Sequence, residues 1–250
     1  TTVGVVSGVF PELGGFWLQS LEDDKNPATS EGLFVNFEEL EISVLPGDWL
    51  EVSGVVQETY QQTQIVLESP DDIQVLSSGH SLPAPVELNP PLDAALAESY
   101  YESLEGMFVQ LTEPAVAVAP TNHYGEYALV RQEHDVARLW QGGENGMVII
   151  VDDGSSQSHD NRSTMAYAIN VGDQVSNLVG PLAYTFGQFK IEAVTVPAVT
   201  TAEVGMSSLP ALESDEFSLM SWNVENLFDF KDPHPSSPEM PTIGEYKISI

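Results

Sequence analysis

The chain has 250 residues, of which 42% are hydrophobic, enough for one large core or two small ones. Seven Lys and Arg stand against 38 Asp and Glu, so the formal net charge is -31. This charge argues against a protein that binds nucleic acid by general neutralisation of phosphates, and against docking on an anionic membrane surface. The absence of cysteine excludes disulfides, zinc–thiolate sites and a thiol nucleophile.

The composition and the N-terminus favour an extracellular protein. A surface rich in carboxylates keeps a chain soluble in salty water, where self-repulsion is screened. The sequence opens on Thr1 rather than Met, which fits a secreted protein after processing or a truncated chain. No apolar run approaches the length of a membrane span, so we expect no membrane insertion.

Short apolar or alternating runs, each bounded by Gly, Pro, Asp or Asn, predict β-strands along most of the chain. In the first part of the sequence they cover residues 3–10, 16–19, 32–36, 50–56 and 64–67. A single stretch, 92–104, has the Ala and Glu content of a helix and follows a pair of prolines. We therefore predict an all-β fold with one short helix.

Two parts of the sequence repeat the same pattern, in which a Gly-Asp turn opens a strand and a second strand follows. The matched segments are 31–35 with 146–151, 46–54 with 171–180, and 64–67 with 189–192. The repeat predicts β domains at residues 1–80 and 104–200, joined by a Pro- and Ala-rich linker, 81–103, that holds the short helix. The first domain has a single basic residue, Lys25, whereas the second has four, so we expect any contact with a polyanion in the second.

The first domain has the features of a small Greek-key barrel: glycines where strands bend, a Gly-Asp turn and a strand–Gly–strand hairpin. Its residues resemble the OB-fold subfamily found in secreted bacterial nucleases. The resemblance rests on five ordered blocks: 4–10 (GVVSGVF), 13–19 (LGGFWLQ), 29–35 (TSEGLFV), 47–58 (GDWLEVSGVVQE) and 63–65 (TQI). We therefore predict two small OB-like Greek-key β-barrels in tandem.

OB-folds bind oligonucleotides by stacking bases on exposed aromatic side chains within a positive groove. Trp17 and Tyr60 are the candidate stacking residues, and Arg138 and Lys190 are the candidate cations. The alternative is that the two aromatic residues complete the core or seal an interface between the domains, and the single base of the first domain favours it. The basic residues equally fit local ion pairs. We expect DNA binding to be weak at most and strongly salt-sensitive.

Two acidic loops, 22–26 and 152–161, carry the hard oxygen ligands that Ca²⁺ uses. In the second loop the candidate metal ligands are Asp152, Asp153 and Asp160. Neither loop has the spacing of an EF-hand, and residues 152–154 also fit an ordinary hairpin turn, which is the more common use of such a sequence.

Residues 217–229 (FSLMSWNVENLFD) predict a buried strand that ends in amide and carboxylate side chains, an arrangement typical of sites in layered α/β folds. This stretch resembles the opening strand of the endonuclease/exonuclease/phosphatase superfamily. The family's Asn, here Asn223, lies beside the divalent metal and helps to position the phosphate. The order of parts resembles ExeM-type extracellular nucleases over essentially the whole chain, with further matches at 101–109, 138–140, 152–155 and 184–191.

The resemblance implies a secreted nuclease that degrades extracellular DNA with Mg²⁺ or Ca²⁺. The family's other metal-binding and catalytic residues would lie beyond the position of Ile250, and Asn223 alone cannot supply a metal site and a proton-transferring His. We predict that the 250-residue chain is inactive by itself and is the N-terminal, non-catalytic region of such a nuclease. Residues 201–216 would be a linker, and 217–250 the start of a truncated α/β sandwich.

Two alternatives remain open. The chain could be a stand-alone extracellular assembly or adhesion module of OB-like barrels, in which the strand at 217–224 pairs between subunits. It could also bind carbohydrate through Trp17, Trp49 or Trp140, although no spacing in the sequence supports this function over the others.

Overall fold

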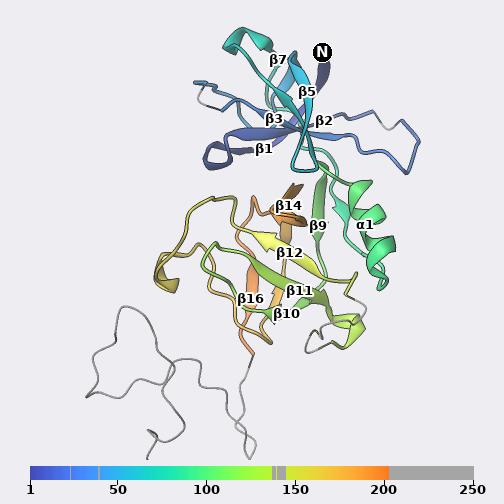
Figure 1. Ribbon diagram of the computed structural model, residues 1–250, viewed down its shortest axis with the longest axis vertical. Helices are drawn as coiled ribbons and strands as arrows, with labels where there is room; N and C mark the ends of the chain where they lie inside the picture. The colour runs from blue at the N-terminus through green and yellow to red at the C-terminus, as the bar shows by residue number, and fades with distance from the viewer. Residues whose placement is uncertain (23, 39, 137–138, 140–144, 203–250) are drawn as a thin grey trace, which may run out of the picture. The chain divides into compact units, whose positions relative to one another are not determined.

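The computed structural model describes residues 1–202 except 23, 39, 137–138 and 140–144. Residues 1–204 form one compact unit. Its described part consists of two β-sheets and a single α-helix, which confirms the predicted all-β fold (Figure 1). We call residues 1–80 the first β unit and residues 81–202 the second β unit, because each contains one sheet. No helix among these residues is long and apolar enough to cross a membrane.

The sheet of the first β unit has seven strands in the order β5-β6-β3-β2-β1-β4-β7. The strands are β1 (Thr2–Phe10), β2 (Gly15–Gln19), β3 (Gly32–Asn36), β4 (Trp49–Val52), β5 (Val55–Thr59), β6 (Gln62–Val66) and β7 (Ile73–Ser77), with short 3-10 turns η1 (Pro11–Leu13) and η2 (Pro70–Asp72). Strands β1, β2 and β3 form an antiparallel meander, β6 runs parallel to β3, and β5 pairs with β6 as a hairpin. Only residues 53–54 separate β4 from β5, so one bent segment joins the two sides of the sheet.

The sheet of the second β unit has nine strands in the order β16-β13-β10-β11-β12-β15-β14-β9-β8. The strands are β8 (Val86–Glu87), β9 (Phe108–Leu111), β10 (Ala115–Ala119), β11 (Tyr127–Arg131), β12 (Ile149–Asp152), β13 (Gln174–Ser176), β14 (Leu178–Thr185), β15 (Gln188–Glu192) and β16 (Ala198–Thr200), with 3-10 turns η3 (Gln132–His134) and η4 (Arg162–Thr164). Again three antiparallel strands, β10, β11 and β12, lead into a parallel pairing, β12 with β15. Strands β13 and β14 are separated by Asn177 alone.

The two sheets share their connectivity, which confirms the internal repeat. Each has a three-strand meander, a last strand parallel to the third, and a bent segment that pairs with both the first and the last strand, as in an OB-like Greek key. The hydrogen-bonded ladders do not close into rings. When the two parallel strand pairs are compared, Gln64 of β6 corresponds to Lys190 of β15. The alignment of the repeats in the sequence is therefore shifted by one residue at this strand.

The helix α1 (Ala94–Glu102) lies within the predicted stretch 92–104. It begins where the Asp93 side chain accepts a hydrogen bond from the Leu96 amide at 2.9 Å, which satisfies one of the free N–H groups of the first turn. Ala97 and Tyr101 are its buried residues, and they pack into the core of the second β unit.

Each β unit has its own apolar core, and a small aromatic cluster lies between them. The first core includes Phe16, Val35 and Leu50, and the second is built on residues of β9 to β15. The third cluster contains Trp17, which packs with two phenylalanines of the first unit and with Ala183 on β14 of the second. The two β units are therefore joined by packed side chains as well as by the chain.

Candidate functional site

A buried cluster of charged side chains lies inside the second β unit, around Lys190. Lys190 is on β15, Asp152 ends the parallel neighbour β12, and Glu126 directly precedes β11. Because β12 lies between β11 and β15 in the sheet, the three residues come together although they are far apart in the sequence. The Lys190 side chain is only 1% exposed.

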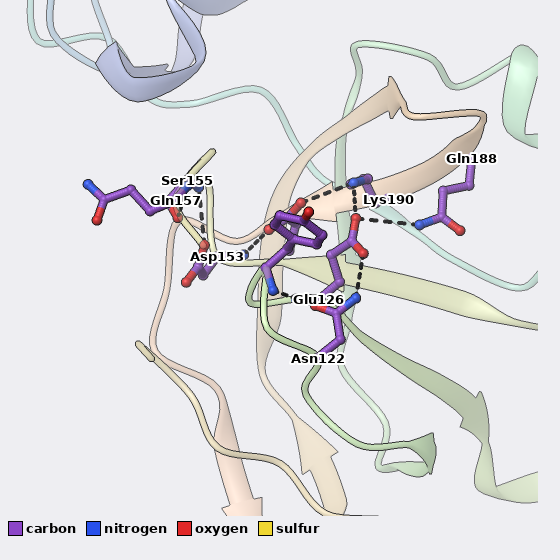
Figure 2. A network of polar contacts seen from close by, with 9 residues as sticks. Asn122, Glu126, Asp153, Ser155, Gln157, Gln188 and Lys190 are labelled. Carbon is purple, nitrogen blue, oxygen red and sulfur yellow. Dashed lines mark hydrogen bonds and ion pairs between the residues drawn. The ribbon is translucent and has the colours of Figure 1, made fainter. Parts of the chain in front are cut away.

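Two carboxylates accept hydrogen bonds from the Lys190 ammonium, and two amide side chains support one of these carboxylates (Figure 2). The Lys190 ammonium donates to Glu126 Oε1, and to Asp152 Oδ2 at 3.1 Å. Asn122 Nδ2 donates to Glu126 Oε2 at 2.8 Å, and Gln188 Nε2 donates to Glu126 Oε1 at 3.5 Å. The cation is thus neutralised by two carboxylates inside the fold, as buried charges require.

The cluster shifts the pKa values of its two carboxyl groups in opposite directions. Burial raises the pKa of Glu126, but the hydrogen bonds from Lys190 and Asn122 and the Lys190 charge outweigh burial and hold it below its usual value. Burial raises the pKa of Asp152, although Lys190 opposes this effect. Burial lowers the pKa of Lys190, but the hydrogen bond that it donates to Glu126 and the Asp152 charge outweigh burial and hold the pKa above its usual value, so the ammonium stays charged.

Glu192 is the fourth charged residue of this region, opposite Asp152 on the parallel strand. It is buried, and its Oε2 has no hydrogen-bond partner among the described residues. Burial raises its pKa well above the usual value, and the Asp152 charge raises it further. Its surroundings therefore favour the protonated, neutral form of Glu192 over the ionised form.

An exposed aromatic side chain lies at the tip of the corresponding hairpin in each β unit. Tyr60 is 89% exposed between β5 and β6, and Phe186 is 93% exposed between β14 and β15. Both have positive φ, 52° in each case, as do the residues that follow them, Gln61 and Gly187. Two successive residues with positive φ form the tight turn that matches the twist of a hairpin. In both turns the aromatic side chain is exposed to solvent.

The two hairpins approach one another, and one of them touches the buried cluster. Tyr184 of β14 donates a hydrogen bond from its hydroxyl to Gln61 Oε1 at 2.6 Å. The Lys190 ammonium lies 5.4 Å from the centre of the Phe186 ring, within the range of a cation–π contact. The tip aromatics and the charged cluster thus form one connected region.

The structure corrects two of the predicted nucleic-acid contacts. Trp17 is 1% exposed in the cluster between the β units, so it offers no face to a base and instead seals the interface, as the alternative interpretation held. Lys190 is buried and neutralised by Glu126 and Asp152, so it is not available to phosphates. Tyr60 is exposed, as stacking requires. Arg138, Asn223 and the strand predicted at 217–224 lie outside the described residues.

The predicted metal ligands do not form a site. Asp152 is bound to Lys190, Asp153 accepts a hydrogen bond from the Ser155 amide at 3.1 Å, and Asp160 is exposed. Within the described ranges no group of three or more His, Asp and Glu side chains is placed to hold a metal ion. The hairpin turn predicted at 152–154 is also wrong, since β12 pairs with β11 and β15 and a long connection leads from it to β13.

Sequence reasoning missed Glu126, Glu192 and Phe186. The two glutamates carry no local signal, because their burial depends on pairing with distant strands. Phe186 could have been found by superimposing the repeats, since it stands before the last strand of its hairpin as Tyr60 does.

The described region is an all-β protein built from two β units of the same connectivity, with a buried charged cluster in the second. The model of a protein family described as a domain of unknown function, DUF8508, matches residues 70–201. The match covers more than half of the chain, and the protein belongs to this family. The match contains the complete second β unit sheet and the Lys190 cluster. No curated protein and no solved structure match the chain.

Proposed function

We propose that the two β units are the non-catalytic, DNA-contacting region of a secreted, metal-dependent nuclease that degrades extracellular DNA. The observation that carries the proposal is the pair of exposed aromatic residues, Tyr60 and Phe186, at corresponding hairpin tips. The hairpin between the last two strands is a place where OB-folds contact oligonucleotides. The resemblance of residues 217–229 to the opening strand of a nuclease domain supports the choice of DNA.

The chemistry of this contact would be stacking rather than phosphate neutralisation. Lys190 is bound by two carboxylates, and Arg131 pairs with Glu87 and Glu133 at 3.1 and 2.9 Å, so both cations are already engaged. Stacking of a base on an aromatic side chain contributes about 1–3 kcal/mol and tolerates any sequence. Unpaired bases are required, so single-stranded segments are the expected target.

The acidic surface makes the salt dependence diagnostic. With a net charge of -31, the protein and DNA repel one another at low ionic strength. Added salt screens this repulsion. In proteins that bind DNA by releasing counterions, added salt instead weakens the binding. We therefore expect binding of single-stranded DNA to be weak and to strengthen as salt is raised.

The test is the fluorescence anisotropy of a labelled oligo-dT titrated with the 250-residue protein, at low and high salt. The double variant Tyr60→Ala/Phe186→Ala is expected to weaken binding about tenfold or more, since two stacking contacts are lost. Tyr124→Ala, which removes a partly exposed aromatic residue outside the two hairpins, is the matched control and should bind as the wild type does. Equal affinity of the double variant and the wild type, or no binding at any salt, would contradict the proposal.

Cleavage itself is assigned to the domain that begins near residue 217. In this proposal the two β units contribute binding and positioning, and the metal ion belongs to the domain that follows them. We expect no Mg²⁺- or Ca²⁺-dependent DNA cleavage by the 250-residue chain. Turnover that is abolished by Asn223→Ala in this chain would contradict this assignment. A regular oligomer without DNA binding would instead favour an assembly module that associates through residues 217–224.

A further inference from the structure

Glu105 lies where the two β units meet, in the short connection between α1 and β9. Its Oε1 accepts a hydrogen bond from the Thr63 amide of β6 at 2.8 Å, and its carbonyl oxygen accepts one from the Ser30 hydroxyl. Both partners belong to the first β unit. One carboxyl-bearing residue of the second unit is therefore attached to the first through its side chain and its backbone.

The surroundings of Glu105 are closely packed. A Cβ placed on Gly32 of the first unit would lie 2.1 Å from the backbone of Gly106. The two backbone segments therefore approach more closely than residues with side chains would allow. Two residues further on, the Phe108 amide donates to Gln19 Oε1 of β2 at 2.7 Å. The junction leaves the Glu105 side chain only 8% exposed.

The second carboxyl oxygen of Glu105 is buried without a partner. Glu105 Oε2 has no hydrogen-bond partner among the described residues, and the charged groups that act on the carboxyl are Glu102 of α1 and Glu58 of β5, both acidic. Burial raises the pKa of Glu105 to about 7, the hydrogen bond from Thr63 opposes this rise in part, and Glu102 and Glu58 add to it. No cation in this set compensates an ionised Glu105.

We propose that Glu105 is a pH-sensitive latch between the two β units, which is closed while the carboxyl is protonated and is loosened when the carboxyl ionises. An ionised carboxylate at this position repels Glu58 and Glu102 and requires water at Oε2. Separation of the backbones of residues 30–32 and 105–106, which are in close contact, would admit this water. The two cores inside the units need not change, so the latch controls the contact between units rather than their folding.

The direction of the pH effect follows from proton linkage. The folded junction holds a proton that an opened junction releases, so rising pH favours opening. The latch is fully closed below the carboxyl's unperturbed value and loses its hold as the pH rises through neutrality. A secreted protein meets both conditions as the pH of its surroundings changes.

Hydrogen exchange of the Thr63 and Phe108 amides, corrected for the intrinsic pH dependence of exchange, tests the latch in the 250-residue protein at pH 5.5 and 8.5. In the wild type the protection of both amides should fall about tenfold or more over this range. In Glu105→Gln, which keeps the Thr63 hydrogen bond and cannot ionise, protection should stay constant. Glu98→Gln on the exposed side of α1 is the matched control and should behave as the wild type does.

Protection of these amides that is independent of pH in the wild type, or equally dependent on pH in Glu105→Gln, overturns the proposal. Should Glu105→Gln fail to fold, the titration of the Glu105 carboxyl carbon by NMR in the wild type replaces it. A midpoint near neutrality supports the latch, and a midpoint below about 5, close to that of an exposed carboxyl, overturns it. The pKa of Glu192 is also raised, but Glu192 lies on β15 inside the second unit, opposite Asp152, and Glu105→Gln leaves it unchanged.

Discussion

In the first β unit, Asn36 and Gln64 occupy the positions that Asp152 and Lys190 occupy in the second, as the register of the two parallel strand pairs shows. The first pair is neutral, with Asn36 Nδ2 donating to Gln64 Oε1 at 3.4 Å. The second is an ion pair, with Lys190 Nζ 3.1 Å from Asp152 Oδ2. The same position of the fold thus accepts an amide pair or a buried salt bridge, provided that each member satisfies the other.

The charged version requires more partners than the neutral one. Lys190 also binds Glu126, which in turn is held by Asn122 and Gln188, whereas Gln64 needs only the Thr59 hydroxyl at 2.8 Å in addition to Asn36. Two residues further along the last strand the contrast is the same, since Val66 of the first unit corresponds to Glu192 of the second. Buried charge is therefore concentrated in the second β unit, where stability should depend on intact ion pairing and on pH.

Replacing the two central residues by methionine should give the largest difference between the units. Lys190→Met leaves Glu126 and Asp152 buried without their cation and should destabilise the protein by about 3–5 kcal/mol, the range for breaking a buried ion pair. Gln64→Met at the corresponding position loses ordinary hydrogen bonds and should cost about 0.5–1.5 kcal/mol. Urea unfolding followed by circular dichroism measures both. Similar losses for the two variants would show that the Lys190 cluster is not the charged counterpart of a neutral pair.

A smaller, pH-dependent effect is expected from Glu192→Gln. The pKa of Glu192 lies well above the ordinary 4.5, so the native state holds a proton that the unfolded chain releases, and its stability falls as the pH rises above that value. The variant cannot ionise at this position, so its stability does not fall for this reason. Between pH 5 and pH 8 its urea midpoint should therefore rise relative to that of the wild type. Parallel pH profiles for the two proteins would mean that Glu192 ionises freely in the native state.

The smallest effect is expected at the hairpin tips, where the two units are alike. Phe186 and Tyr60 hold positive φ, which Asn adopts more easily than a bulky residue. Phe186→Asn and Tyr60→Asn should each stabilise the protein by about 0.5–1 kcal/mol while weakening the proposed DNA contact. Tyr124→Asn, at a residue without positive φ, should bring no gain. Thermal melting and the anisotropy titration together detect this exchange, and a loss of stability in both tip variants would show that the aromatic residues serve packing.

Local features of the sequence predicted the strands, the helix near residues 94–102 and the repeat, because alternation and turn residues act over a few positions. They did not predict which polar residues are buried. Lys190 has partners 64 and 38 residues away in the sequence, and a lone lysine on a strand reads as a surface cation. Trp17 is enclosed in a cluster that includes Ala183 of the other unit. Contacts of this kind follow from tertiary pairing, which a single sequence does not specify.

The natural protein offers the most direct test of the proposed nuclease role, through its intact mass, its C-terminal peptide and its cleavage of DNA in Mg²⁺ or Ca²⁺. The proposal predicts a chain that continues for several hundred residues past Ile250 and cleaves DNA, with activity lost in Asn223→Ala. A natural chain that ends at Ile250, or one that continues but does not cleave DNA, would contradict it.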